Sequence, residues 1–308
     1  MKSPVKSTGP TAPARAPPPP GAFAGAKGRS LWAEAWRRMR RNRAAVVSAA
    51  LLGLIALAAL SAPWLSPHAF DAIDWERIGA PPDWAAGHYF GTDAVGRDLF
   101  ARTLYGGRIS LLVGLVATAV SALIGIGYGA VAGYAGGRTD ALMMRFVDVL
   151  YSLPFMFLVI LLMVIFGRHI FLMFVAIGAV EWLSMARIVR GQTLSLKHRE
   201  FIEAARACGV STSAILRRHI VPNALGPVVV YMTLTVPQVI LFESFLSFLG
   251  LGVQEPDTSW GVLISEGARQ MESAPWTLIF PAGFLAATLF CLNFIGDGLR
   301  DALDPRYR

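Results

Sequence analysis

Residues 109–137 have the sequence ISLLVGLVATAVSALIGIGYGAVAGYAGG, in which no Asp, Glu, Lys or Arg occurs. About 20 mostly apolar residues are enough for a helix to cross the hydrocarbon core of a bilayer. This stretch exceeds that length and carries none of the charges that a surface helix of a soluble domain would show. It therefore predicts a membrane-spanning helix.

Further uncharged windows occur at 44–70, 149–167, 219–242 and 273–296, and a window at 169–186 is interrupted only by Glu181. Only 16% of the residues are charged, against about 25% in typical soluble domains. We therefore predict an all-α polytopic membrane protein with six transmembrane helices and with both termini on one side. The predicted spans are about 45–64, 110–134, 149–166, 170–187, 225–250 and 278–296.

The distribution of basic residues predicts the orientation of these spans. If the N-terminus is cytoplasmic, 22 Lys and Arg residues lie on the cytoplasmic side and 6 lie on the opposite side. Short cytoplasmic loops of membrane proteins carry such an excess of positive charge. The prediction places both termini and the basic segment 187–218 in the cytoplasm, and it explains the net charge of +8 without a nucleic-acid partner.

The first 30 residues differ in composition from the rest. They are rich in Pro and Ala and contain no apolar core or cleavage site typical of a signal peptide. Such a segment cannot bury enough apolar surface to offset the entropy of ordering. We predict a disordered cytoplasmic tail at 1–30 and a membrane domain at 31–308. The two cysteines, Cys208 and Cys291, lie in different settings and predict no disulfide framework.

The basic cytoplasmic loop shows helical periodicity. Phe201, Ala204, Ala205 and Cys208 recur at helical spacing and form a narrow apolar stripe, while Arg199, Glu203 and Arg206 are spaced to pair along another face. Small residues in such a stripe allow the close approach of a partner protein. An equally ordinary interpretation is an amphipathic helix that rests on lipid headgroups.

A glycine and a proline divide this loop. Gly209 predicts a helix end because glycine adopts the left-handed conformation found just past a helix C-terminus. Ser211 or Thr212 is a suitable cap for a second short helix, which is expected to run to about His219 and stop before Pro222. The predicted unit is helix, glycine turn, helix.

The identities and spacing of Glu203-Ala204-Ala205, Gly209 and Ile220-Val221-Pro222 resemble the EAA loop of permease subunits in bacterial ATP-binding cassette importers. The resemblance extends from about Leu31 to Arg306 and is strongest to the second, C-type permease of dipeptide, oligopeptide and nickel importers. Other stretches that carry it are Phe90-Gly91-Thr92-Asp93, Gly96-Arg97-Asp98, Ser244 to Gly252, Ser259-Trp260-Gly261, Ser273-Ala274-Pro275-Trp276 and Gly296 to Arg306.

This resemblance implies a type I importer permease fold in the bacterial inner membrane, with a core at about 100–300 and a coupling loop at about 197–223. It implies a homologous second permease, two cytoplasmic ATPase subunits that receive the coupling loop, and an external substrate-binding protein. The implied ATPase-coupling residues are Glu203, Ala204, Ala205, Gly209, His219, Pro222 and Asn223.

The sequence supports the same division of labour. A phosphate-binding loop needs Gly-Lys followed by Ser or Thr, and none of the four lysines follows a glycine. We therefore expect no catalytic residue and no cofactor in this chain, with ATP and Mg²⁺ bound by partner subunits.

Ionisable residues within the predicted spans are candidate pore-lining residues, because buried charge in a membrane usually faces a cavity or a partner. Glu181 and Glu243 are the two candidates, and a structural ion pair or a position near the interface is the alternative for each. Asp148 is expected to pair locally with Arg145, three residues earlier.

Other site types have less support. The five histidines are scattered over different loops, so no metal site is predicted.

The external segment 64–109 either docks a binding protein or forms a structured cap on the helices. A secondary transporter would often show an internal repeat, and a membrane enzyme would need a convergent catalytic set; the sequence shows neither. The transported substrate stays open among dipeptides, longer peptides, glutathione-like compounds and nickel chelates.

Overall fold

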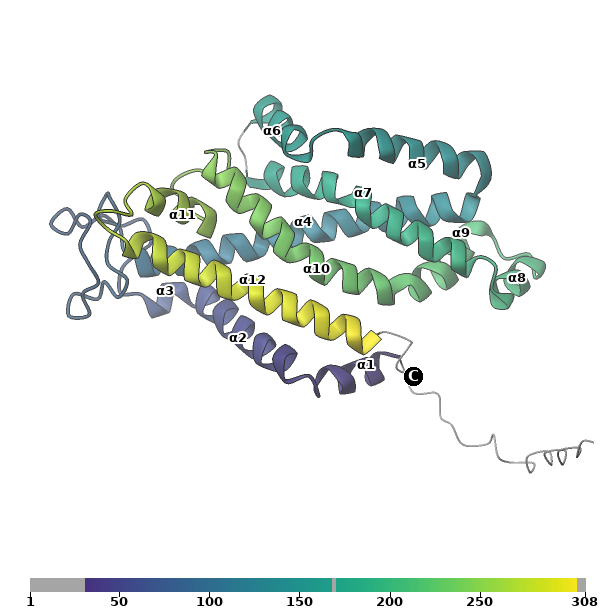
Figure 1. The fold of residues 1–308 in the computed structure, drawn as a ribbon, viewed down its shortest axis with the longest axis horizontal. Coiled ribbons are helices and arrows are strands. Elements are labelled where there is room, and N and C mark those ends of the chain that lie inside the picture. Colours follow the sequence, from purple (N-terminus) through teal and green to yellow (C-terminus); the bar gives the residue numbers. More distant parts are fainter. Residues whose placement is uncertain (1–30, 168–169, 304–308) are drawn as a thin grey trace, which may run out of the picture.

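The computed structural model describes residues 31–167 and 170–303. The predicted disordered tail at 1–30 lies outside these residues. The described part contains long helices that run lengthwise side by side, with the α3–α4 connection at one end and α8 and α9 at the other (Figure 1). The helices are α1 Leu31–Met39, α2 Arg43–Leu60, α3 Ala62–Leu65, α4 Leu99–Ala135, α5 Gly137–Ser152, α6 Phe155–Phe166, α7 Ile170–Leu196, α8 Glu200–Ala207, α9 Thr212–Ile215, α10 Val221–Phe248, α11 Trp260–Ala268 and α12 Trp276–Leu303.

Most of the predicted spans are confirmed as membrane-length helices. Within 31–167 and 170–303, α2, α4, α7, α10 and α12 are long and apolar enough to cross a bilayer, and α5 with α6 makes a sixth span if that bent pair is counted as one. The all-α fold class is therefore confirmed. Helix α4 begins at Leu99, well before the predicted start at 110, because polar residues outside the apolar window extend it, whereas α10 stays within a few residues of the predicted 225–250.

The predicted span at 149–166 is not one continuous helix in the structure. The chain breaks between α5 and α6, and the two helices meet at an angle of 84°. Leu153 has an extended conformation with φ −76° and ψ 137°, as expected for a residue that precedes a proline. Pro154 therefore ends the first helix, and α6 alone is too short to cross the membrane.

Glycines bring α4 and α7 into close contact. A Cβ atom at Gly125 would lie 2.5 Å from the Met185 Cβ, and one at Gly129 would lie 2.4 Å from the Ala186 carbonyl oxygen. A Cβ at Gly133 would lie 2.7 Å from the Cβ of Thr193. These three glycines are four residues apart and form one face of α4, a pattern that lets membrane helices approach closely. The helix pair α4–α7 consequently forms the centre of the bundle.

The segment between α3 and α4 is a structured cap, as one of the two sequence interpretations predicted. Asp98 caps α4 by accepting a hydrogen bond from the Ala101 N–H at 2.7 Å, and it also accepts one from the Ser66 hydroxyl at 3.2 Å. Its other carboxylate oxygen lies 2.8 Å from Nδ1 of the buried His88. This one carboxylate therefore ties the cap to the first turn of α4.

A second cluster of charges joins the cap to α11. Arg97 donates to Asp93 at 2.7 Å, and the buried Arg102 lies 3.2 Å from the Glu266 carboxylate. Burial raises the pKa of Glu266, although the neighbouring Arg102 and Arg97 oppose that shift. The cap and α11 are thus held by paired charges, and the Trp64, Trp75 and Trp84 side chains remain exposed on the outside.

Candidate coupling and translocation sites

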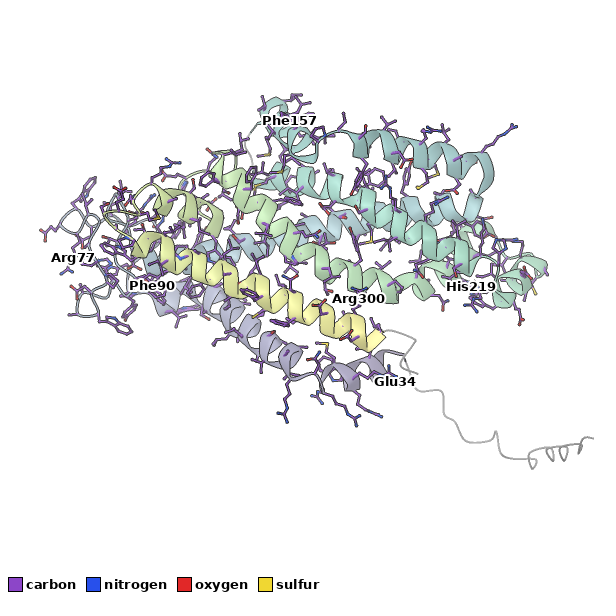
Figure 2. All side chains as sticks on the ribbon, in the orientation of Figure 1. Glu34, Arg77, Phe90, Phe157, His219 and Arg300 are labelled. Atoms are coloured by element: carbon purple, nitrogen blue, oxygen red, sulfur yellow. The ribbon has the colours of Figure 1, made fainter. Side chains whose placement is uncertain are left out.

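The α8–α9 segment has the predicted helix, glycine turn, helix form. Helix α8 ends at Ala207 with Cys208 as its C-cap, and Gly209 follows with φ +75°, the left-handed conformation that favours glycine. The Ser211 hydroxyl then caps α9 by accepting from the Ala214 N–H at 3.4 Å. Figure 2 shows His219 near this end of the molecule and Arg77 at the opposite end.

The side chain that anchors α8 is Ile202, which the sequence interpretation missed. Ile202 is fully buried and packs in a cluster with Ile215 and Ile220, with Tyr134 and Leu196 at its edge. Of the predicted stripe, Ala205 packs against this cluster, whereas Phe201, Ala204 and Cys208 are exposed. The sequence could have indicated this anchor, because Ile202 is the one branched aliphatic residue of α8. The interpretation followed the stripe that contains the small residues instead.

The polar face of α8 differs from the prediction. Among the described residues, no ion pair involves Glu203, whose side chain is exposed. Arg206 instead places its guanidinium over the Tyr134 ring, 5.4 Å from its centroid. The predicted pairing of Arg199, Glu203 and Arg206 is therefore wrong, because Arg206 packs against the Tyr134 ring while the Arg199 and Glu203 side chains are exposed. Glu203 stays available at the surface.

The second helix does not stop before Pro222, contrary to the prediction. It passes through a π-helical turn, Leu216–Ile220, in which the Val221 N–H donates to the Leu216 carbonyl. Pro222 follows this turn directly, and its missing N–H leaves one carbonyl of the preceding turn without a helical partner, which the wider π-helical turn accommodates. The Asn223 amide donates to the His219 carbonyl at 2.6 Å across the junction. The result is a continuous helix from Thr212 to Phe248.

Ile202→Asp is expected to release α8 from the bundle. An unpaired carboxylate in an apolar cluster destabilises local packing by about 3 kcal/mol or more. Trypsin cleavage after Arg199 and Arg206 in isolated membranes should therefore accelerate at least about tenfold. Ala207→Asp, which puts the same charge on an exposed position of α8, should cleave at the wild-type rate. Equal cleavage of both variants would show that Ile202 does not hold α8.

Glu181 lies near the middle of α7 in the wall of a cavity of about 870 Å³. The α5–α6 break, α7 and α10 form this cavity, and the Glu181 side chain is partly buried. The sequence-predicted candidate therefore faces an open space at membrane depth. The residues that accompany it, Tyr231 and Gln238 of α10, could be found only once the packing of α7 on α10 was known.

Glu243 has a different setting. Its side chain is fully buried, and it accepts hydrogen bonds from the hydroxyls of Ser259 at 2.6 Å, Ser247 at 2.7 Å and Ser110 at 3.4 Å. These hydroxyls come from α4, α10 and the start of α11. In this structure Glu243 reaches no surface, so its geometry supports a structural polar contact and gives no support to a pore-lining role.

Two ion pairs join α5 to α7. The Arg187 guanidinium lies 2.8 Å from the Asp148 carboxylate, and Arg190 donates to Asp140 at 2.5 and 2.7 Å. The predicted local pair between Asp148 and Arg145 is wrong, since α7 brings a closer cation. These pairs hold α5 beside the C-terminal half of α7.

No group of three or more metal-ligating side chains occurs among residues 31–167 and 170–303. The sequence analysis missed one association of histidines: the His68 and His88 rings stack with their centroids 4.2 Å apart. Nonlocal packing of the cap produces this contact, which sequence spacing does not reveal. Its partners include an aspartate and backbone atoms rather than a third ring.

The membrane-length helices, the structured cap at one end and the exposed α8–α9 segment at the other define a polytopic membrane subunit of the permease class. Residues 125–308 match the family of binding-protein-dependent transport system inner membrane components, and residues 30–82 match the N-terminal transmembrane domain of oligopeptide transport permease C. The chain belongs to this family of ABC transporter permeases, as a multi-pass inner-membrane component of the OppC type.

Individual relatives agree over nearly the whole chain. The chain is 60% identical to the oligopeptide transport system permease protein OppC of Haemophilus influenzae over 282 residues, which is 92% of this chain and 91% of that protein. It is 62% identical to OppC of Escherichia coli K12 over 92% of this chain and 93% of that protein. A chain of the MetNI methionine ABC transporter, solved in inward-facing conformations, aligns with a TM-score of 0.47 and 19% identity, over 65% of this chain and 94% of that one.

The two family matches and the OppC relatives confirm the predicted resemblance to C-type permeases of peptide importers. They also confirm that the chain is a transmembrane transport component and not a catalytic subunit.

Proposed function

We propose that this chain forms one half of the translocation path of an ATP-driven oligopeptide importer. The substrate class is taken from the two OppC relatives, whose names state oligopeptide transport. Dipeptides and related small solutes are the neighbouring possibilities that an uptake assay separates. The path lies between this chain and a homologous second permease.

The other partners follow from the same division of labour. Two ATP-binding cassette ATPase subunits bind ATP and Mg²⁺ in the cytoplasm, and an external substrate-binding protein delivers the peptide. The family name supports a binding protein. The absence of a Gly-Lys-Ser/Thr motif from the sequence supports ATP binding by another chain. This chain itself uses no cofactor.

The continuous helix Thr212–Phe248 is the observation that carries the proposed mechanism. Its first turns share a buried cluster with Ile202 of α8, so α8, α9 and α10 move as one body. ATP binding closes the ATPase pair, the docked α8–α9 segment moves with it, and α10 tilts to open the path to one side or the other. Glu203, Ala204, Ala205, Gly209, His219, Pro222 and Asn223 are the proposed coupling residues.

Both termini and the α8–α9 segment are assigned to the cytoplasm. The excess of basic residues on that side supports this orientation. In Figure 1, α1 and the C-terminal end of α12 also lie toward the α8 end of the bundle. Cysteine labelling from one side of the membrane tests the assignment, because the exposed Cys208 should react only with reagent added to the cytoplasmic face.

Purification and transport together test the proposal. The tagged chain, expressed with its neighbouring transport genes, should co-purify with two ATPase subunits and a second permease. Proteoliposomes containing that complex should import an oligopeptide only with ATP and the binding protein, and vanadate should inhibit the uptake. Peptide uptake by the isolated chain without ATP would overturn the proposal and would favour a secondary transporter.

A further inference from the structure

The cavity beside Glu181 combines a mostly apolar wall with several polar side chains. Its volume of about 870 Å³ falls within the range of small-molecule binding sites. Phe157 of α6 lies at its edge and is largely exposed (Figure 2). Glu181 is the only acidic residue among the described residues that line it, and Tyr231 and Gln238 are hydrogen-bonding side chains in the same wall.

The Glu181 carboxylate has no ion pair in the part of the chain that the structure describes. Arg187, the next basic residue along α7, is already held by Asp148 at 2.8 Å and by the face of the Tyr151 ring at 4.4 Å. A carboxylate at membrane depth is costly unless it faces a cavity or meets a partner. Glu181 therefore faces the cavity without a cation of the chain beside it.

The chemistry of the cavity indicates the kind of group that fits it. A lone carboxylate attracts a cation, and ammonium donates hydrogen bonds that carboxylate, phenol and amide oxygens accept. The surrounding Leu, Met and Phe side chains suit the apolar side chains of a peptide. A peptide carries such an ammonium group at its amino terminus or on lysine.

We propose that Glu181 forms a transient subsite for the ammonium group of a peptide during its passage. This inference rests on the proposed function, since it assigns a contact to the cargo of that importer. Tyr231 and Gln238 orient the ammonium group, and the wall around Phe157 contacts the neighbouring side chain. The site selects cationic groups inside the membrane, after the external binding protein has released the peptide.

Uptake by the complete importer in proteoliposomes tests the subsite. Three alanine oligopeptides of equal length are compared: one with a free amino terminus, one acetylated, and one acetylated with a single lysine. Each is supplied at a concentration that saturates the binding protein. The wild type should import the free-amine peptide faster than the acetylated one. In Glu181→Gln the ratio of the two rates should fall about tenfold, because a hydrogen bond between charged groups is lost.

Variants and controls make each outcome decisive. Glu181→Asp should retain part of the ratio, and combining Glu181→Gln with Gln238→Glu should restore it, since the carboxylate returns to the same cavity. Glu272→Gln removes an exposed carboxylate outside the cavity and should leave the ratio unchanged. Preference for the lysine peptide would assign the site to side-chain ammonium, and preference for the free amino terminus alone would assign it to the backbone end.

The subsite would be overturned if Glu181→Gln left the uptake of both ammonium peptides relative to the acetylated alanine peptide unchanged, or if all three peptides lost uptake equally in an assembled complex. The second result would mean that Glu181 acts on the protein and not on the cargo. If the wild-type complex hydrolyses ATP but imports none of the peptides, the proposed function itself fails. The two failures are thus distinguishable.

Discussion

Gly209→Val is expected to lower peptide uptake at least about tenfold while the chain still inserts into the membrane. Gly209 has φ +75°, and a side chain with a Cβ is strained there by about 1–2 kcal/mol, with more for a β-branched residue. A Cβ at this position would meet nothing within 4 Å, so the effect comes from the backbone alone. The turn between α8 and α9 should therefore change its direction, and the proposed docking surface should lose its shape.

Uptake and ATP hydrolysis by the reconstituted complex measure this effect. Uptake should fall at least about tenfold, with hydrolysis no longer stimulated by the loaded binding protein. Gly209→Asn should retain most activity because asparagine tolerates the left-handed conformation. Gly191→Val adds the same side chain to an exposed site on α7 and should behave as wild type. Normal coupled uptake in Gly209→Val would remove the turn from the mechanism.

Gly129→Leu is expected to prevent stable folding of the bundle. Its Cβ alone would lie 2.4 Å from the Ala186 carbonyl oxygen and 2.9 Å from the Val189 Cβ, and backbone atoms of α7 cannot move aside as a flexible side chain can. Forcing extra atoms into a packed interior lowers the free energy of unfolding by about 1–3 kcal/mol. Here two helices must also separate along their length. We expect a loss at the upper end of that range or beyond it.

The yield of monodisperse chain in mild detergent and its thermal midpoint measure the effect. Gly127→Leu is a matched control on the same helix, because Gly127 is exposed and a Cβ there meets nothing within 4 Å. It should leave the chain stable. A normal thermal midpoint for Gly129→Leu would show that α4 and α7 are not in contact at this glycine.

Much of the fold was predictable from local sequence. The uncharged windows predicted α2, α4, α7, α10 and α12 because a bilayer requires long apolar helices with their backbone groups satisfied internally. The glycine turn at Gly209 was equally predictable, since few residues other than glycine adopt its conformation. These features depend on residues close to one another in the chain.

The wrong predictions have two causes. Some depend on contacts between segments that are far apart in the sequence, and others on local sequence signals that compete with one another. Pro154 breaks a window whose composition alone predicts one span. Pro222 was read as a helix stop, but the π-helical turn before it lets the helix continue. Asp148 pairs with Arg187 because α7 lies beside α5, and no spacing rule predicts that partner.

The sequence by itself determined the membrane class, the permease family and the site of the glycine turn, because hydrophobic length, residue identity and backbone preference are local properties. Tertiary structure alone decided that Ile202 anchors α8, that Glu243 is enclosed by three hydroxyls and that Glu181 faces a cavity. The reason is physical: burial and open space are set by what packs against a side chain, and those neighbours come from helices far away in the sequence.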